Sequence, residues 1–396
     1  MKKKYKIETS LSHDGTESQK HLGAVVPPIF QNSLFTYKDW DSIDSAFDNR
    51  VNQYIYSRGK NPTVELVEKK LAMMAGGEKA QLFPSGMAAI TAACLHFLNP
   101  GDHIITLKNL YGPASNLLND YLVEKMNVSV SCVKGDKIED FENTITEKTK
   151  LIYLESPSTA IFSLQDLEGV AKLAKKNDIK TIVDNTWATP LYQKPLSMGI
   201  DLEVHSCSKY LGGHSDIVGG VVIGSEKDVD GIFFHEYKLL GSKVAPFEAW
   251  LLLRSLRSLP VRLRQHQKNA KAVAKFLDSH AEVSVVYYPG LESFPQTKLA
   301  KKQMSGYTGL MSFKLKTDNL DKIKKFVNSL ILFQLGVSWG GHESLVYAHA
   351  ISYLKELSEE QFKNMGISLG DIRISVGLEH KKDLIQDLKT AFDQMN

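Results

Sequence analysis

The sequence predicts an α/β protein in which helices cover both faces of a mostly parallel central sheet, with a smaller α+β domain at the C-terminal end. Three observations support this fold class. Strand-like apolar runs alternate with helical segments between residues 61 and 257, a pattern typical of parallel sheets. The alternation loosens over residues 258–396. The length of 396 residues also suggests two or three domains, at about 150 residues each.

The expected elements follow one another closely along the central part of the chain. A first helix begins at Pro62, ends at Gly76-Gly77, and has apolar residues at helical spacing, namely Val64, Val67, Leu71 and Met74. The strands expected after it are 80–83, 103–107, 128–133, 150–155, 180–184, 202–206 and 217–223. The helices expected between these strands are 86–98, 115–126 and 166–176.

The two ends of the chain differ from this central part. Residues 1–60 are polar and irregular, so we expect an arm that lies across another surface, such as a partner subunit. Residues 61–257 are expected to form the ligand-binding α/β domain and residues 258–396 the C-terminal α+β domain. The last helix should place four apolar residues on one face, and these are Leu384, Ile385, Leu388 and Phe392.

The composition excludes several classes of function. Hydrophobic residues make up 43%, charged residues 23%, and the net charge is +3, which favours neither a nucleic-acid partner nor a membrane surface. The basic start "MKKKYK" is not followed by an apolar signal segment. The three cysteines share no metal-ligand spacing and suggest no disulfide framework, and the histidines at 214, 342 and 349 are not expected to form a metal cluster. We therefore expect a cytoplasmic protein without a metal.

Polar and charged residues stand at the ends of two successive expected strands. Asp184 ends one apolar strand, and Ser206 ends the next, followed by Ser208 and Lys209 in the stretch "HSCSKYLGGHSD". Ligands of parallel sheets bind at the carboxyl ends of the strands, so these residues are expected near one site. A lysine in such apolar surroundings is unfavourable as a buried cation, because desolvation disfavours its charged form.

One ligand explains the lysine, the carboxylate and a nearby strand-to-helix turn together. Ser85-Gly86 lies at that turn, where backbone N–H groups at a helix N-terminus suit a phosphate. The Lys209 amine can form a Schiff base with an aldehyde, while Asp184 can keep a ring nitrogen protonated. Singly, each residue has a simpler explanation as a turn residue, a common glycine or a solvated lysine. Their combination predicts pyridoxal 5′-phosphate, PLP.

Several long motifs resemble the Cys/Met-metabolism family of PLP-dependent enzymes. They are "YSRGKNPT", "FPSGMAA", "LYGP", "ESPS", "HSCSKYLGGHSD", "RSLRSLPVRLRQHQKNA" and "SWGGHESL". The resemblance extends over nearly the whole chain. It implies the type I fold of PLP-dependent transferases, PLP as the cofactor and an amino-acid substrate.

The resemblance also implies roles for the residues that match family motifs. The cofactor would be held by Lys209 as the Schiff-base lysine, Asp184 at the ring nitrogen, Tyr111 stacked on the ring, and Gly86, Met87, Ser206 and Ser208 at the phosphate. Tyr56 and Arg58 would reach the phosphate of the neighbouring subunit, which makes a dimer the smallest active unit; the family is usually tetrameric. The substrate would contact Arg373 through its α-carboxylate, together with Ser338, Trp339 and Tyr56. Lys209 would act as the base, and Tyr111 could assist as an acid or base.

Within the family, three residues favour the branch of bacterial cystathionine β-lyases. Trp339 stands in "SWGG", where most γ-acting members resemble "SLGG". Pro113 follows "YG", where methionine γ-lyases typically have cysteine, and Thr159 replaces the asparagine of "SPSN". The resemblance thus implies a carbon–sulfur β-lyase that cleaves cystathionine or related cysteine S-conjugates to a thiol (homocysteine from cystathionine), pyruvate and ammonia.

Two alternatives stay open on the sequence alone. One is a γ-acting member of the same family: a cystathionine γ-lyase, a γ-synthase or a methionine γ-lyase. The other is a non-catalytic nucleotide-binding α/β module, although no "GxGxxG" follows the first strand and no "GxxxxGK[ST]" occurs. Ile55, Phe162 and Trp339 are candidates either for an apolar substrate pocket or for core packing. Cys207 is expected to be a small buried residue rather than a nucleophile.

Overall fold

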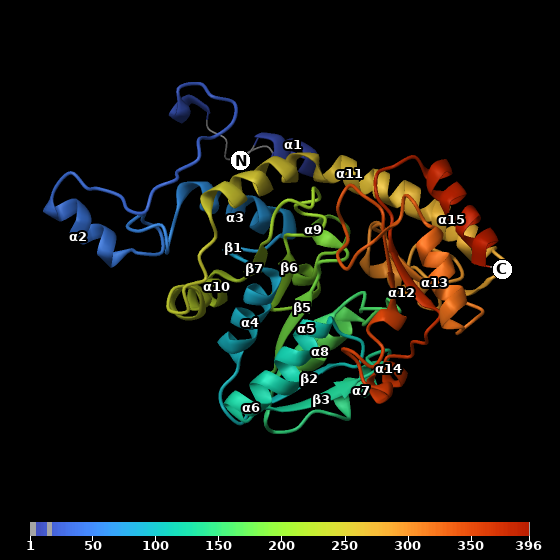
Figure 1. The fold of residues 1–396 in the computed structure, drawn as a ribbon. Coiled ribbons are helices and arrows are strands. Elements are labelled where there is room, and N and C mark those ends of the chain that lie inside the picture. The colour runs from blue at the N-terminus through green and yellow to red at the C-terminus, as the bar shows by residue number, and fades with distance from the viewer. Residues whose placement is uncertain (1–4, 14–17, 396) are drawn as a thin grey trace.

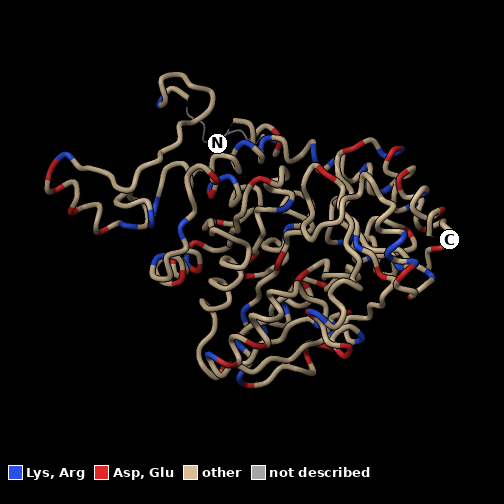
Figure 2. The backbone as a smooth tube through the Cα atoms, in the orientation of Figure 1, with Lys and Arg blue, Asp and Glu red and all other residues tan. Residues whose placement is uncertain are grey.

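The computed structural model describes residues 5–13 and 18–395. Figure 1 shows an N-terminal arm in blue, a larger α/β domain in the centre, and a smaller domain in orange and red. The first four residues of "MKKKYK" lie outside the described residues. Figure 2 shows Lys and Arg interspersed with Asp and Glu along the backbone.

The larger sheet contains seven strands within the described residues, in the order β1-β7-β6-β5-β4-β2-β3. Its strands are β1 (Lys79–Phe83), β2 (His103–Leu107), β3 (Ser129–Val133), β4 (Thr149–Glu155), β5 (Lys180–Asp184), β6 (Leu202–Ser206) and β7 (Gly220–Gly224). β6, β5, β4, β2 and β3 run parallel. β7 is antiparallel to both of its neighbours, β1 and β6. The mostly parallel sheet is therefore confirmed.

Helices cover both faces of this sheet, as expected. The helices of this part are α3 (Pro62–Ala75), α4 (Gly86–Phe97), α5 (Gly112–Asn116), α6 (Leu122–Met126), α7 (Ile138–Glu142), α8 (Leu167–Lys176), α9 (Thr189–Tyr192) and α10 (Glu226–Ile232). Val222 of β7 packs in a cluster with α4, whereas the adjacent Val221 packs with α3. Alternate side chains of one strand thus enter opposite cores.

Most expected boundaries agree with the structure, and two differ for local reasons. α3 ends where Gly76 adopts a left-handed conformation with φ 81° and donates its N–H to the Ala72 carbonyl. The strand expected at 217–223 begins only at Gly220, because the residues before it form the loop that carries Lys209. The helix expected at 115–126 starts at Gly112 and includes a π-helical turn at Leu117–Tyr121.

Helix α11 (Pro246–Asp278) joins the two domains. It passes without interruption through residue 257, where the sequence suggested a boundary, so both domains share one helix (Figure 1). The smaller sheet has the order β10-β11-β12-β9-β8. Its strands are β8 (Val283–Tyr287), β9 (Leu310–Leu315), β10 (Gln334–Leu335), β11 (Leu345–Ala348) and β12 (Asp371–Ser375), and its helices are α12 (Thr297–Gln303), α13 (Leu320–Ser329), α14 (Glu359–Asn364) and α15 (Lys381–Met395).

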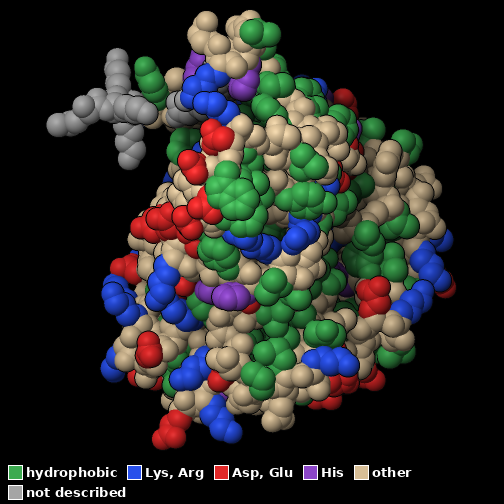
Figure 3. Space-filling view, turned by 90° about the vertical axis from the view of Figure 1, so that its left-hand side faces the viewer, with side chains coloured by type: hydrophobic (Ala, Val, Ile, Leu, Met, Phe, Trp, Pro, Cys, Tyr) green, Lys and Arg blue, Asp and Glu red, His purple; other side chains and the backbone are tan. Residues whose placement is uncertain are grey.

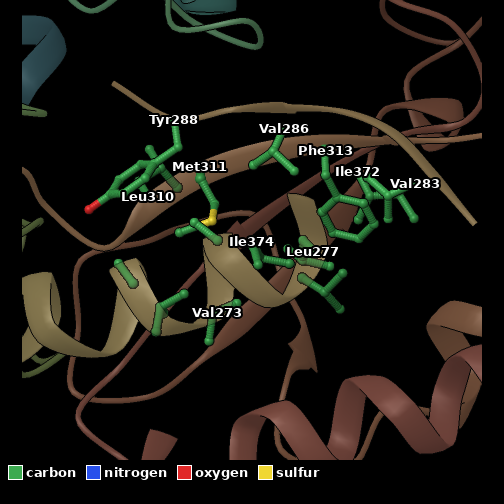
Figure 4. Packing of buried hydrophobic residues seen from close by; sticks show 14 of the residues in the cluster. Val273, Leu277, Val283, Val286, Tyr288, Leu310, Met311, Phe313, Ile372 and Ile374 are labelled. Atoms are coloured by element: carbon green, nitrogen blue, oxygen red, sulfur yellow. The ribbon is translucent and has the colours of Figure 1, made fainter. Parts of the chain in front are cut away.

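The core of the smaller domain forms between its sheet and the last turns of α11. Figure 4 shows Val273 and Leu277 of α11 pointing toward Phe313, Ile372 and Ile374 of the sheet. The last helix, α15, packs into the same cluster as predicted. Its residues Leu384, Leu388 and Phe392 are buried, and Ile385 is partly buried.

The N-terminal arm is less irregular than the sequence suggested, since it contains α1 (Ile7–His13), a 3₁₀ turn (Ser18–His21) and α2 (Trp40–Asp48). α1 packs against α3 and α11 and buries Leu11 completely. α2 projects away from the domain (Figure 1), and Trp40 is 80% exposed. Figure 3 shows apolar side chains grouped on the side of the molecule from which the arm projects. Within the described ranges, no helix has the length and apolar character needed to cross a membrane.

Candidate active site

The site is built where three neighbouring parallel strands end at the same edge of the larger sheet. β4 ends at Glu155, β5 at Asp184 and β6 at Ser206. Glu155 and Asp184 stand opposite each other in the register of β4 and β5. Because β7 returns antiparallel from Gly220, opposite Ser206, the loop between β6 and β7 crosses this edge and brings Lys209 to it.

A cavity of about 350 Å³ lies at this edge. The sequence-predicted residues that line it are Gly86, Met87, Tyr111, Asp184, Ser206, Ser208, Lys209, Ser338, Trp339 and Arg373. They come from both domains: the strand ends and α4 belong to the larger one, and residues 338, 339 and 373 to the smaller one. The fold thus brings together residues that are up to 287 positions apart in the sequence (373 − 86).

The N-terminus of α4 is open to this cavity. Ser85 caps the helix by accepting a hydrogen bond from the Ala88 N–H at 3.0 Å. A Cβ atom at Gly86 would lie 3.0 Å from the Cβ of Ser206, so a larger residue there would be crowded and Ser206 would have to move by a few tenths of an ångström. The close approach of helix and strand leaves backbone N–H groups and the Ser206 hydroxyl beside one another, which suits an anion.

The Asp184 carboxylate is oriented by hydrogen bonds from Thr186, two residues further along the chain. Its Oδ1 accepts hydrogen bonds from the Thr186 N–H at 2.9 Å and from the Thr186 hydroxyl at 2.5 Å. Burial raises the pKa of Asp184, and the two bonds from Thr186 act in the opposite direction. A buried carboxylate of this kind favours a cationic ring nitrogen as its partner, because pairing restores the electrostatic stabilisation lost with water.

Lys209 lies between the two domains. Its Nζ donates to Ser338 Oγ at 2.7 Å and lies 5.4 Å from the centre of the Trp339 ring. Burial, with a contribution from the Arg373 guanidinium, lowers the pKa of Lys209 to about 8, although the Asp184 carboxylate opposes this change. A substantial fraction of the amine is therefore neutral near pH 8, as a nucleophile or base requires.

Arg373 stands on β12 at the cavity wall. Its Nη2 donates to the Val337 carbonyl, and its guanidinium carbon lies 5.2 Å from the centre of the Tyr347 ring. Burial lowers the pKa of Arg373 to about 10, so the group stays charged at neutral pH. It is available as a bidentate donor to a carboxylate.

Glu155 is a lining residue that the sequence reasoning missed. It accepts the backbone N–H of Tyr111 at 2.7 Å, which fixes the start of α5 and the position of the Tyr111 side chain. Burial beside Asp184 raises the pKa of Glu155. Its position at the end of an expected strand, like that of Asp184, was the signal that could have identified it.

Three sequence candidates lie elsewhere in the described chain. Tyr56 and Arg58 line a separate cavity of about 110 Å³ together with Ile55 and Lys238, and the Arg58 Nη1 donates to the Lys238 carbonyl at 2.8 Å. Ile55, a candidate for an apolar pocket or for core packing, thus lines a different cavity of the chain from Trp339.

Two other apolar candidates have clear positions. Phe162 lines the 350 Å³ cavity and also belongs to the core of the smaller domain, a position compatible with either role considered for it. Cys207 is fully buried, and burial raises the pKa of its thiol well above the ordinary range. A packing role for Cys207 agrees with this environment.

Comparison with known proteins identifies the family of this chain. A family model described as "Cys/Met metabolism PLP-dependent enzyme" matches residues 8–393. L-methionine gamma-lyase of Pseudomonas putida is 38% identical over 384 residues, which cover 97% of this chain and 96% of that protein. Cystathionine beta-lyase of Lactococcus lactis subsp. cremoris (strain MG1363) is 37% identical over 388 residues, which cover 98% of this chain and 99% of that protein. This chain belongs to the Cys/Met-metabolism family of PLP-dependent enzymes.

A solved structure supports the same assignment. Cystathionine gamma synthase from Xanthomonas oryzae pv. oryzae, in complex with cystathionine, superposes with a TM-score of 0.93 at 34% identity, covering 99% of both chains. The family resemblance, the fold class and PLP as the cofactor are therefore confirmed. The relatives named above include β-acting and γ-acting enzymes, so the family alone does not decide the reaction.

The cavity residues fit this cofactor. Lys209 offers a partly neutral amine to an aldehyde, and Asp184 offers a buried carboxylate to a ring nitrogen. Gly86 lacks the Cβ atom that would crowd Ser206, which leaves a cradle of donors for a phosphate. Tyr111 lines the same cavity with its ring about half exposed, as a stacking partner requires.

We expect the apoprotein to take up PLP at a rate that increases as the pH rises through about 8, because the neutral fraction of the Lys209 amine grows over that range. The rate can be followed by cofactor absorbance after rapid mixing. Lys209→Ala should bind PLP without this pH dependence and should have no turnover. A rate that stays constant across this range in the unmodified protein would show that the Lys209 amine is not the attacking group.

Proposed function

We propose that this chain is a PLP-dependent carbon–sulfur β-lyase that acts on cystathionine or a related cysteine S-conjugate. The products would be a thiol (homocysteine in the case of cystathionine), pyruvate and ammonia. The observation that carries this proposal is the position of Lys209, whose Nζ lies beside Ser338 and next to the Trp339 ring. One amine in this position can serve both proton transfers of a β-elimination.

The residues of the chain would divide the work as follows. Arg373 binds the substrate α-carboxylate and so orients the Cα–H bond toward Lys209. The neutral Lys209 amine takes the proton from Cα and then returns it to the departing sulfur. When bound, PLP supplies an electron-accepting ring that stabilises negative charge at Cα. Asp184 supports this by keeping a cationic ring nitrogen paired.

Tyr111 is the second group that could move a proton. Burial raises the pKa of Tyr111, with smaller contributions from Asp184 and Glu155, so its hydroxyl is a neutral donor at physiological pH. It can protonate the leaving sulfur if Lys209 does not. Its backbone link to Glu155 keeps it at the cavity in either case.

The cavity wall indicates which cysteine conjugates suit the site. Apart from the charged residues already assigned, its lining is largely apolar and includes Pro157, Ala160, Phe162, Trp187, Val218, Leu310, Val337 and Trp339. Apolar surface favours apolar groups on the substrate sulfur. Cysteine S-conjugates with apolar thiol groups are therefore proposed as substrates alongside cystathionine.

A γ-acting enzyme is the second candidate, because the methionine gamma-lyase of Pseudomonas putida has 38% identity to this chain. Elimination at Cγ needs an additional proton removal at Cβ, and therefore more proton-transfer steps at the site than β-elimination does. The nucleotide-binding alternative has lost its support, since the family is one of PLP-dependent enzymes.

Identification of the keto acid decides between β- and γ-elimination. We expect pyruvate and homocysteine from cystathionine, and pyruvate from S-alkyl cysteines, measured by chromatography of the derivatised keto acids. Methionine, which lacks a sulfur on Cβ, serves as the matched control and should give no keto acid. Release of 2-oxobutyrate as the main product would overturn the β-lyase proposal and favour the γ-acting alternative.

We also propose that the arm completes the site of a neighbouring subunit with Tyr56 and Arg58. Both side chains are exposed and lie at a separate basic cavity. The arm near them presents exposed apolar residues such as Trp40 and Leu34, which suits burial against a second copy. A dimer would then be the smallest active unit, and a tetramer is the expected assembly.

Mixing two inactive variants tests this arrangement. Arg58→Ala and Lys209→Ala should each have little activity alone. Unfolded and refolded together, they should regain up to about a quarter of the wild-type activity, because one site in a mixed dimer receives both native residues. No recovery, with mixed dimers demonstrated by mass spectrometry, would place Arg58 and Lys209 in the same subunit's site.

A further inference from the structure

Tyr347 lies behind Arg373 on the neighbouring strand. β11 and β12 are antiparallel, and Tyr347 stands directly opposite Arg373 in their register. Side chains at such paired positions extend from the same face of a sheet, and here the guanidinium carbon lies 5.2 Å from the centre of the tyrosine ring. Among the described residues that line the cavity, Arg373 is present and Tyr347 is not. The contact with Arg373 therefore links Tyr347 to the cavity.

We propose that Tyr347 is a positioning residue for the substrate carboxylate, and that its ring supports the Arg373 guanidinium in the orientation that binds it. This inference rests on the carboxylate role proposed above for Arg373. A cation over an aromatic face is attracted by the ring quadrupole. The ring therefore restricts the arginine before the substrate arrives, which reduces the entropy lost on binding.

The guanidinium keeps donors free in this arrangement. One of its nitrogens, Nη2, donates to the Val337 carbonyl, and the guanidinium carbon lies over the Tyr347 ring. An arginine has five N–H donors in one plane. A second edge thus remains available for two parallel hydrogen bonds to a carboxylate.

The ring of Tyr347 is itself held in place. Its hydroxyl shares a hydrogen bond with the Ser352 hydroxyl, and the Ser352 Oγ donates to Glu356 Oε2 at 3.0 Å. This chain of hydrogen bonds runs from the ring to the carboxylate of Glu356 at the surface. On another side, the His349 ring packs edge-on against the Tyr347 ring, with 5.9 Å between the two ring centres and an interplanar angle of 90°.

His349, which packs against the Tyr347 ring, is uncharged at physiological pH. Burial lowers the pKa of His349 to about 3, and Arg373 contributes to the same shift. The imidazole is therefore neutral at physiological pH, so it exerts no cationic repulsion on the guanidinium. Arg373 thus contacts the Tyr347 ring and the Val337 carbonyl, and the neutral His349 imidazole packs against that ring.

Equilibrium binding of two small probes to the PLP-loaded enzyme tests this inference. L-Alanine carries the α-carboxylate and has no leaving group on Cβ, whereas ethylamine lacks the carboxylate. Binding is measured from the change in cofactor absorbance. We expect Tyr347→Leu to weaken L-alanine binding by about 3- to 30-fold and to leave ethylamine binding within about twofold. Tyr347→Phe keeps the ring and should lose less affinity for L-alanine than Tyr347→Leu.

Steady-state turnover should also distinguish an effect on substrate binding from an effect on the chemical steps. In Tyr347→Leu we expect a raised KM for the substrate and a smaller fall in kcat, since the ring acts directly on carboxylate binding and reaches proton transfer only through the orientation that Arg373 gives the substrate. Cofactor content and the thermal unfolding midpoint are recorded for each variant. Equal weakening of L-alanine and ethylamine, or no weakening of either, would overturn the role of Tyr347.

Two further variants keep the outcome interpretable. Ser352→Ala releases the tyrosine hydroxyl without removing the ring, and this variant can be tested even if Tyr347→Leu does not fold. We expect it to weaken L-alanine binding selectively by about two- to fivefold. No selective loss would contradict the proposal. Arg373→Lys should weaken L-alanine binding by about 10- to 100-fold. If Arg373→Lys leaves L-alanine binding unchanged, the carboxylate role of Arg373 is wrong. If Arg373→Lys weakens L-alanine binding and Tyr347→Leu does not, only the supporting role of Tyr347 is wrong. The identity of the keto acid product affects neither result.

Discussion

The site depends on the balance of charge around the Lys209 amine. Burial and the nearby Arg373 guanidinium favour its neutral form, and the Asp184 carboxylate favours its charged form. The result is an amine that is still largely protonated at neutral pH and is deprotonated easily. A fully exposed lysine would stay charged, and a lysine buried without Asp184 nearby would be more difficult to accommodate in the fold.

Sheet topology is what brings these groups together. Parallel strands place their carboxyl ends at one edge, so Glu155, Asp184 and Ser206 meet there without any long-range signal in the sequence. The reversal at β7 makes the connecting loop cross the same edge, and this positions Lys209. The smaller domain then closes the cavity with Ser338 and Arg373. Helix α11 runs through both domains and so limits how far these two halves can separate.

The parts of this arrangement that depend on local patterns could be predicted from the sequence. Asp184 and Ser206 end apolar strands, and Gly86 opens a helix after a strand, so periodicity alone placed them at one edge. Arg373 could not be assigned in this way, because a short strand with one arginine has many possible surroundings; its role came from the family resemblance.

Other features depend on pairings between distant segments, which the sequence does not specify by itself. The support of Arg373 by Tyr347 arises from the register of β11 and β12, and the contact of Glu155 with the Tyr111 N–H joins residues 44 positions apart. Ile55 lies away from Trp339 because the arm that carries it projects from the domain. The continuous helix through residue 257 also shows that a change in pattern need not mark the end of an element.

The most direct measurement is the location of the covalently attached cofactor. The PLP-loaded protein is reduced with borohydride, digested and mapped by mass spectrometry. The account predicts a single pyridoxyl-phosphate modification on the peptide that carries Lys209. A modification on another lysine, or no modification in protein that shows the cofactor absorbance, would contradict it.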